Sequence, residues 1–465
     1  MSTDRMLILT VVRAWRSRSE SRLALAGALW LLAAPPLAPA QEPALIEGSG
    51  YATTLGSPME LAARLDQILA DPALTRAHLG LVVQVAETGE VLYERDGEKL
   101  FVPASNTKIV TAAVALDALG PAYRWRTSLV ADGDISDGVL NGDLWIVGGG
   151  DPQLGRETVA SWPELLGRAG IRRIAGDVIG DDRAFGGPQW GEGWYWHEVF
   201  ASWAAGVSAL QVWPNTVRAR LLPGARVGDP ARFELTRPGP ALPMAIDVRT
   251  GAPGSDVRLQ YEPPPEGGDV RMTGWIPASD TTNLHLATHH PTLYLLETLG
   301  EALADAGIEV EGRIRRVAGA ARPINPGWTH IASSDSLGAV VSEMLKQSDN
   351  QMAESILRTV GLEATGEGTA AAGLAVVGGV LAGWGIEPGA MALSDGSGLS
   401  RYNRIAPSAM ARLLRAMWRH DEYRVFFTGL PVAAVDGTLR RRLAGTPAEE
   451  NVRAKTGSLS SARAL

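Results

Sequence analysis

A serine and a lysine lie three residues apart in the segment from Ser105 to Lys108, with the sequence SNTK. The alanine- and valine-rich run that follows to Gly120 predicts a helix, on which residues i and i+3 share a face. A serine becomes a nucleophile when a neighbouring base takes its proton. A buried lysine can be that base once its pKa falls some 3 units from roughly 10.4. Taken alone, the pair is better interpreted as a serine helix cap followed by a solvated lysine.

Two further motifs change that interpretation. Ser348-Asp349-Asn350 lies at a predicted turn between two helices, where short polar side chains can project into a cleft. Lys455-Thr456-Gly457-Ser458 ends a predicted strand over 452–455, where glycine allows close approach to the backbone and lysine and threonine can bind a carboxylate. The chain contains only four lysines. Chance therefore predicts roughly 0.2 SxxK matches and well under 0.1 K-[ST]-G matches. The ordered set therefore favours a serine nucleophile with a lysine base.

The composition points the same way. Of 43 basic residues, only Lys99, Lys108, Lys346 and Lys455 are lysine, and the other 39 are arginine. Arginine stays protonated, whereas a desolvated lysine can lose its proton, so a retained lysine invites a chemical role.

Several classes of protein are excluded. The net charge of −8 argues against a nucleic-acid surface, and the absence of cysteine removes thiol catalysis and disulfides. The sequence contains no HExxH pair, Walker loop, GxGxxG or GxSxG motif, and His289-His290 are adjacent rather than at helical spacing. We therefore expect no nucleic acid partner, no metal and no organic cofactor.

In this order SxxK, SxN and KTG resemble the signature of the penicillin-recognising serine enzymes. The sequence is most similar to the type-4 penicillin-binding proteins, the D-alanyl-D-alanine carboxypeptidase/endopeptidases, in which a large insert separates the first two motifs. Here 243 residues separate Ser105 from Ser348. Further matches are VGGGDP over 147–152, DGSGLSR over 395–401 and DGTL over 436–439.

The resemblance implies a role for two residues in each of the first two motifs. Ser105 would attack the carbonyl between two terminal D-alanines while Lys108 takes its proton. Ser348 would relay that proton to the leaving D-alanine, and Asn350 would position the substrate amide and Lys108. Water would then release the acyl-enzyme, whereas a β-lactam would acylate Ser105 in the same way and leave slowly.

The resemblance also implies how the third motif binds substrate. Lys455 and Thr456 would hold the terminal carboxylate, beside Gly457. Backbone N–H groups of Ser105 and Ser458 would form the oxyanion hole.

Other residues carry weaker expectations. The resemblance implies that Asp151 and Arg401 contact the amine and carboxylate of a diaminopimelate side chain. The alternative is that Asp151 caps a turn and that Arg401 forms a surface ion pair. Lys346 is interpreted as a helix-end cation. A group of tryptophans suggests a sugar platform, although core packing of the insert is favoured. These are Trp190, Trp194, Trp196 and Trp203.

The first 40 residues predict a secretory signal peptide. Arginines lead into an apolar stretch over 23–34, followed by Ala38-Pro39-Ala40. The stretch is shorter than the roughly 20 residues of a membrane-spanning helix. We expect cleavage after Ala40 and an exported, periplasmic or extracytoplasmic product, soluble or loosely wall-associated, with no integral membrane segment.

The pattern along the chain predicts one α/β domain split by an insert. Ser57-Pro58 begins a helix, 79–85 and 90–93 form a hairpin, and helices return over 293–306, 337–346, 352–360 and 409–420. Between them, short strands such as 144–147 and 257–261 alternate with turns. The expected units are a signal peptide over 1–40, a transpeptidase-like domain over 41–124 and 283–465, and a β-rich insert over 125–282.

The resemblance implies an α/β (α+β) serine β-lactamase/transpeptidase-like fold, an antiparallel sheet flanked by helices. The chain is interpreted as truncated after the KTG strand, because the family continues into further strands and a closing helix. The expected activity is that of a serine D,D-peptidase on peptidoglycan stem peptides, inhibited by β-lactams. Carboxypeptidase and endopeptidase action both stay open, as do a serine β-lactamase or esterase and a catalytically silent peptidoglycan-binding or β-lactam-sensing protein.

Overall fold

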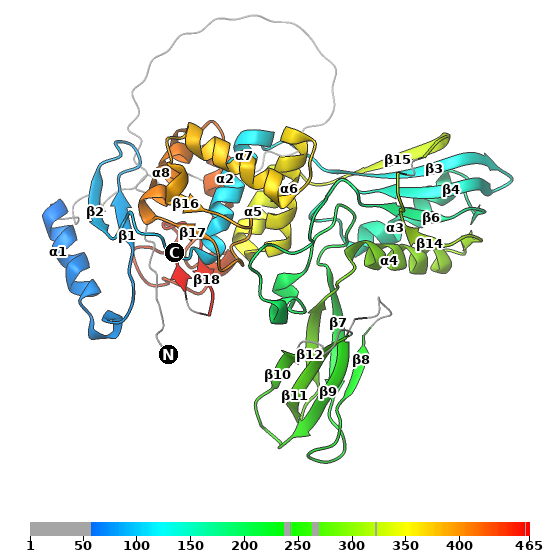
Figure 1. Ribbon diagram of the computed structural model, residues 1–465, viewed down its shortest axis with the longest axis horizontal. Helices are drawn as coiled ribbons and strands as arrows, with labels where there is room; N and C mark the ends of the chain where they lie inside the picture. Colours follow the sequence, from blue (N-terminus) through cyan, green and yellow to red (C-terminus); the bar gives the residue numbers. More distant parts are fainter. Residues whose placement is uncertain (1–56, 237–241, 243, 263–268, 321–322, 461) are drawn as a thin grey trace, which may run out of the picture.

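The computed structural model describes residues 57–236, 242, 244–262, 269–320, 323–460 and 462–465. The predicted signal peptide lies outside these residues. The described chain is elongated, with a helical body at one end and a mostly β body at the other (Figure 1). Each body has its own large buried core. Among the described residues, no helix has both the length and the apolar character to cross a membrane.

The helical body is built around one helix, α2 (Thr107–Leu119), which is buried from Thr107 to Leu116. The three helices predicted after residue 337 are confirmed: they are α5 (Leu337–Gln347), α6 (Asn350–Thr365) and α8 (Pro407–Arg419). The structure adds two that the sequence did not predict, α7 (Ala370–Gly383) and α9 (Tyr423–Gly429). All five helices contribute to the core around α2 (Figure 1).

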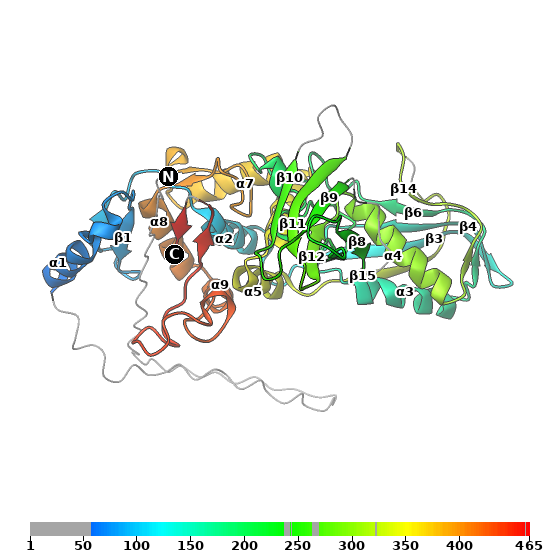
Figure 2. The same cartoon turned by 90° about the horizontal axis from the view of Figure 1, so that it is seen from below.

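The amino-terminal elements form a small unit at the end of this body (Figure 2). α1 (Pro58–Leu69) begins as predicted, with the hydroxyl of Ser57 accepting from the Glu60 N–H. β1 (Leu81–Gln84) and β2 (Val91–Arg95) form the predicted antiparallel hairpin. Their apolar faces and the inner face of α1 share a small separate core.

Short antiparallel pairs complete the helical body: β16 (Met391–Ala392) with β17 (Arg404–Ile405), and β18 (Gly457–Ser458) with β19 (Arg463–Ala464). The prediction of a strand over 452–455 is wrong. Arg453 makes one isolated bridge to Val432, and the strand begins only at Gly457. A β-like sequence does not form a ladder where no partner strand runs beside it.

The β body contains a seven-stranded mixed sheet. The long hairpin of β3 (Arg126–Ser136) and β4 (Val139–Val147) is its centre, and α3 (Arg156–Arg168) and α4 (Pro291–Asp305) pack together against it (Figures 1 and 2). The remaining strands are β5 (Arg173–Ile174), β6 (Val178–Asp181), β13 (Glu309–Val310), β14 (Ile314–Arg316) and β15 (Pro326–Ser333).

Two three-stranded sheets form a separate lobe beside this body (Figure 1). One has the order β12-β7-β8 and the other β10-β11-β9. Their bounds are β7 (Thr216–Leu222), β8 (Arg232–Leu235), β9 (Met244–Gly251), β10 (Arg258–Glu262), β11 (Val270–Pro277) and β12 (Thr282–Ala287).

The chain leaves and re-enters the helical body side by side. β15 pairs antiparallel with β3, and the Ser334 N–H donates to the Trp125 carbonyl at 3.1 Å. α4, β13, β14 and β15 all pack with the β body, although they follow residue 282. We therefore propose that the insert extends from about Trp125 to about Ser334, rather than ending at 282.

Candidate active site

Ser105 lies in a single 3₁₀ turn, Ala104–Asn106, that leads directly into α2. Its side chain is half-buried. The turn is tightly held: the Thr107 hydroxyl donates to the Ala104 carbonyl at 3.0 Å. Gly398 packs so closely that a Cβ there would lie 1.8 Å from the same carbonyl oxygen. The nucleophile candidate is thus fixed at a helix N-terminus.

Lys108 lies one turn into α2 with 0% of its surface exposed. Its Nζ donates to Ser105 Oγ at 3.2 Å, to Asn350 Oδ1 at 2.5 Å and to the Ser397 carbonyl at 2.6 Å. Burial lowers the pKa of Lys108 to about 8, although three nearby carboxylates oppose the shift. A substantial fraction of this amine is therefore neutral near pH 8, as a general base requires.

Ser348 and Asn350 occupy the α5–α6 junction. Ser348 caps α5 in the left-handed conformation, with φ 63°. Asp349 caps α6 by accepting from the Met352 N–H at 2.8 Å, and the Trp213 indole donates to its other oxygen at 3.1 Å. This tight turn places the side chains on either side of Asp349 against the two buried lysines.

Lys455 is the second buried lysine, with 1% of its surface exposed. Its Nζ donates to Ser348 Oγ at 2.8 Å and to the Thr456 carbonyl at 2.7 Å. Burial, and then the charge of Lys108, hold the pKa of Lys455 well below its ordinary value. An arriving carboxylate would favour the charged form, so this amine is suited to binding one.

The third motif also contacts the turn of the nucleophile candidate. A Cβ at Gly457 would lie 2.6 Å from the Pro103 carbonyl oxygen, so only glycine allows β18 to approach this closely. Thr456 Oγ1 lies 2.8 Å from Thr438 Oγ1. Ser458, the other residue of β18, is exposed. The structure thus brings the side chains or backbone of all three motifs together, and their catalytic roles stay predictions.

Lys346 is more than a helix-end cation. It forms an ion pair with Asp436, whose other carboxylate oxygen accepts from the Val432 N–H at 2.8 Å. Gly437 packs on the Lys346 carbonyl, where a Cβ would lie at 2.8 Å. This turn therefore connects the end of α5 to Thr438, the partner of the KTG threonine.

Asp151 follows β4 and is 8% exposed. Its Oδ1 accepts from the Gln153 N–H at 2.9 Å, which is the geometry of a turn cap. Burial, with the charge of Asp335 adding to it, raises the pKa of Asp151 to about 6. The hydrogen bonds described for Asp151 are local and none reaches the three motifs. Its predicted contact with substrate stays a prediction.

Arg401 pairs with an acid that the sequence did not single out. Its guanidinium binds both oxygens of Glu198, at 2.8 and 3.1 Å, and lies 4.3 Å over the ring of Tyr195. Arg401 and Glu198 are 203 positions apart, so sequence spacing carries no sign of their contact. The acid paired with Arg401 is therefore Glu198, and the predicted contact of Arg401 with substrate stays a prediction.

The predicted tryptophan group divides into two halves. Trp190 and Trp194 are half-buried, and the Trp194 indole donates to Asp395 Oδ2 at 2.8 Å. Trp196 and Trp203 are 46% and 58% exposed. The carbonyl of Trp203 accepts from Asn350 Nδ2 at 2.7 Å, so this segment of the insert borders the SxN motif directly.

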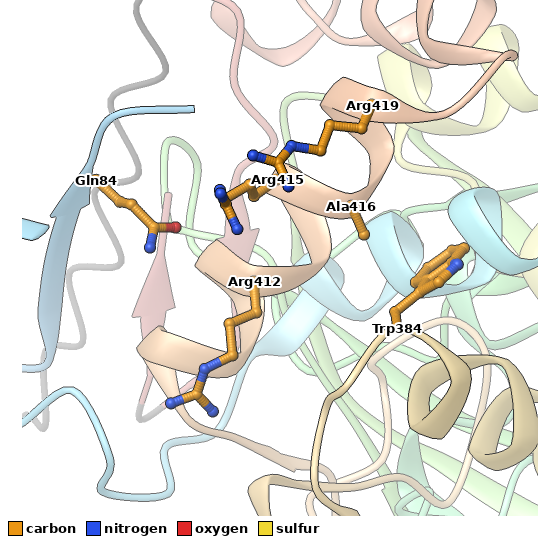
Figure 3. Close-up of a pocket in the computed structure, with 6 residues that line it drawn as sticks. All are labelled: Gln84, Trp384, Arg412, Arg415, Ala416 and Arg419. Carbon is orange, nitrogen blue, oxygen red and sulfur yellow. The ribbon is translucent and has the colours of Figure 1, made fainter. Parts of the chain in front are cut away.

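A cavity of about 380 Å³ lies elsewhere, between β1 and α8 (Figure 3). Two of its arginines bind the hairpin turn: Arg415 donates to the Thr88 carbonyl and Arg419 to the Glu87 carbonyl, each at 3.0 Å. These guanidinium groups tie the hairpin to α8. No motif residue lines the cavity, whose lining is Gln84, Trp384, Arg412, Arg415, Ala416 and Arg419.

Comparison with known proteins agrees with the motifs. The model of the D-Ala-D-Ala carboxypeptidase 3 (S13) family matches residues 61–465. The chain belongs to this family. Among curated relatives, a D-alanyl-D-alanine carboxypeptidase of Actinomadura sp. (strain R39) is 33% identical over 439 residues, covering 91% of this chain and 80% of the relative. A D-alanyl-D-alanine carboxypeptidase of Haemophilus influenzae is 27% identical over 396 residues, covering 82% and 80%.

The fold is that of a solved penicillin-binding protein. Penicillin binding protein 4 from Haemophilus influenzae matches with a TM-score of 0.74 and 27% identity, over 81% of this chain and 84% of that one. The same protein complexed with a β-lactam matches with a TM-score of 0.69 and 26% identity, over 81% and 83%. The predicted mixed α/β penicillin-binding fold is confirmed.

Proposed function

We propose that this S13 member is a serine-type D-alanyl-D-alanine carboxypeptidase/endopeptidase that acts on peptidoglycan stem peptides through an acyl-enzyme on Ser105. The observation that carries the proposal is the fully buried Lys108 amine, 3.2 Å from Ser105 Oγ and bound to Asn350 Oδ1. Family membership supports the reaction class, and the site supports the mechanism.

Acylation begins with Lys108 in its neutral form. Its amine takes the proton of Ser105 as Oγ bonds to the carbonyl carbon of the penultimate D-alanine. The N–H groups of Ser105 and Ser458 stabilise the negative charge that develops on the carbonyl oxygen. The lowered pKa of Lys108, about 8, keeps part of the enzyme competent near neutral pH.

Collapse of the tetrahedral intermediate breaks the bond to the terminal D-alanine nitrogen, which takes up a proton through the Ser348 hydroxyl. The Lys455 amine, 2.8 Å from Ser348 Oγ, orients that hydroxyl. Water then attacks the ester on Ser105, with Lys108 again as base. A β-lactam ring opens by the same attack, and its product is retained on Ser105.

The terminal carboxylate binds Lys455 and Thr456. Charge attraction and the threonine hydroxyl both favour this anion, and β18 brings them next to the nucleophile. The cluster of Arg401, Glu198 and Tyr195 binds a charged side chain of the stem peptide. Because Arg401 and Glu198 offer one charge of each sign, the cluster suits a group that carries both an amine and a carboxylate.

We propose that the protein works outside the cytoplasm. The amino-terminal pattern of basic, apolar and Ala-Pro-Ala segments supports export, and the wall is where stem peptides occur.

Two measurements test the proposal. Release of free D-alanine from a pentapeptide is expected with the wild-type chain and lost with Ser105→Ala. Fluorescent penicillin is expected to label the wild-type chain and not the variant. Rapid turnover of penicillin without D-alanine release would instead establish a β-lactamase. Absence of both labelling and release would establish a silent binding protein.

A further inference from the structure

A buried carboxylate lies behind the candidate base. Glu354 is one turn along α6 from Asn350 and has 0% of its surface exposed. Its Oε1 accepts from the N–H groups of Gly396 and Ser397, each at 2.9 Å. The carbonyl of Ser397 accepts in turn from Lys108 Nζ at 2.6 Å. One short chain of hydrogen bonds therefore joins Glu354 to the amine.

This carboxylate is not explained by the needs of the loop alone. Asp395 already holds that loop by accepting from the Gly398 and Ser400 N–H groups at 2.8 and 2.7 Å. The guanidinium of Arg358 is 3.5 Å from Glu354, and its other nitrogen donates to the Pro188 carbonyl. Burying an acid is costly even when it is paired, as Glu354 is with Arg358, so its presence behind Lys108 calls for a function.

We propose that Glu354 is a positioning residue for acylation: it holds the Gly396–Ser397 segment so that the Ser397 carbonyl aims Lys108 Nζ at Ser105. The negative charge of Glu354 adds to that of Asp395 and Asp349 in favouring the protonated form of Lys108. This inference rests on the proposed function. Asn350 and Ser397 approach the amine from different elements, so losing either restraint would leave Nζ free to turn away from Ser105 Oγ.

The charges around Lys108 determine the sign of the electrostatic effect. Three carboxylates face Lys108: Asp395 on the loop, Asp349 at the start of α6 and Glu354 within α6. Lys455 faces it from the β18 side, and Arg358 stands behind Glu354. Each carboxylate favours protonated lysine. Removing one therefore lowers the pKa of Lys108 and lets it act at lower pH.

Burial and Asp395 raise the pKa of Glu354 to about 7, against about 8 for Lys108. Glu354 is thus ionised over the range where Lys108 loses its proton. Glu354→Gln keeps an oxygen that can accept both N–H groups but removes the charge. The acid limb of its rate profile should move to lower pH by about one unit.

The experiment measures the acylation rate constant with fluorescent penicillin from pH 5 to 10, on the full chain. Glu354→Gln is expected to move the acid limb down by about one pH unit. Glu354→Asp keeps the charge but shortens the side chain by one methylene. The pH of the acid limb should therefore be unchanged, while the maximal acylation rate at high pH falls about tenfold. Glu363→Gln, on the same helix and bonded to the exposed Tyr123 hydroxyl, is the matched control and should keep the wild-type profile.

A purely structural role for Glu354 would lower thermal stability without moving the limb, and that result would overturn the inference. The inference would also be overturned if Glu354→Asp showed the same acid limb and the same maximal acylation rate as the wild type. If Ser105→Ala labels like the wild type, the proposed function fails and this inference fails with it. If Ser105→Ala is silent but the limb of Glu354→Gln is unchanged, the inference alone fails.

Discussion

Replacing Gly457 by alanine tests whether the KTG strand must touch the turn that carries Ser105. The backbone of Gly457 is not in the left-handed region, so alanine is tolerated conformationally. The obstacle is contact: the new Cβ would lie 2.6 Å from the Pro103 carbonyl oxygen and 3.1 Å from Ala104 Cβ. Both atoms belong to backbone or to a short rigid side chain, so neither can swing aside.

The displacement follows from these distances. Ordinary van der Waals contact begins at 3.4 Å, which is 0.8 Å more than the distance to the Pro103 oxygen. β18 must therefore move by most of an ångström, taking Lys455 and Thr456 away from Ser105. A misplacement of about 1 Å at a reacting centre costs about 10²-fold in rate. The strain itself should destabilise the fold by about 1–3 kcal/mol.

The assay is the second-order rate constant for acylation by fluorescent penicillin, with the melting temperature measured alongside. Gly379→Ala, on the exposed side of α7 with open space at its Cβ, should keep the wild-type rate. Gly142→Ala clashes with the Asp132 carbonyl at 1.9 Å in the distant β3–β4 hairpin, so it should lower stability without slowing acylation of folded protein. A folded Gly457→Ala protein acylated within twofold of the wild-type rate would refute the reasoning.

Three further predictions concern single side chains. The acylation rate of the wild type should rise with pH and level off above about pH 8, because only neutral Lys108 accepts a proton. Lys108→Arg should lower kcat/KM about 10³-fold, since arginine stays protonated. Lys99→Arg, at an exposed side chain, should leave kcat/KM unchanged. Ionisation of buried Asp151 disfavours folding as pH rises from about 4 through 6. Asp151→Asn should therefore raise the free energy of unfolding at pH 8 by at most about 3 kcal/mol, with a higher Tm, and should leave both unchanged at pH 4. A higher KM for the pentapeptide would show substrate contact, and a Tm difference between the variant and the wild type that is the same at both pH values would contradict the burial argument. Thr438→Val removes the hydroxyl beside Thr456 and should raise KM about fivefold with kcat retained, a prediction that an unchanged KM would exclude.

Local chemistry was predictable because it depends on short sequence separations. The 3.2 Å contact between Lys108 Nζ and Ser105 Oγ agrees with the i, i+3 spacing, which places the two side chains on one helix face. α6 begins within the SxN motif because Asp349 is a strong N-cap. The order of the three motifs then indicates that distant segments meet at one place.

Long-range partners were not predictable from spacing. Glu198 meets Arg401 across 203 positions, and Glu354 meets the 396–397 segment across more than 40. A signal for Glu354 did exist, since Asn350 and Glu354 stand at i and i+4 and therefore share a helix face with the SxN motif. Only the fold shows that the face shared by these two residues is buried.

Elements of the insert were missed for local reasons. α3 contains Pro163, which as an internal proline argues against a helix, yet Val159, Trp162 and Leu166 are buried at helical spacing. The position at which the insert ends depends on pairing of β15 with β3, which a hydrophobic pattern does not report. Sheet partners are chosen by tertiary packing rather than by propensity.

The central claim is that Ser105 forms the acyl-enzyme with Lys108 as its base. Locating the acyl group by mass spectrometry of proteolytic peptides, after reaction with penicillin, tests it most directly. The account predicts one added penicillin on the peptide that contains Ser105, none in Ser105→Ala, and a rate that falls below pH 8. An adduct on any other residue, or an equal adduct in Ser105→Ala, would contradict it.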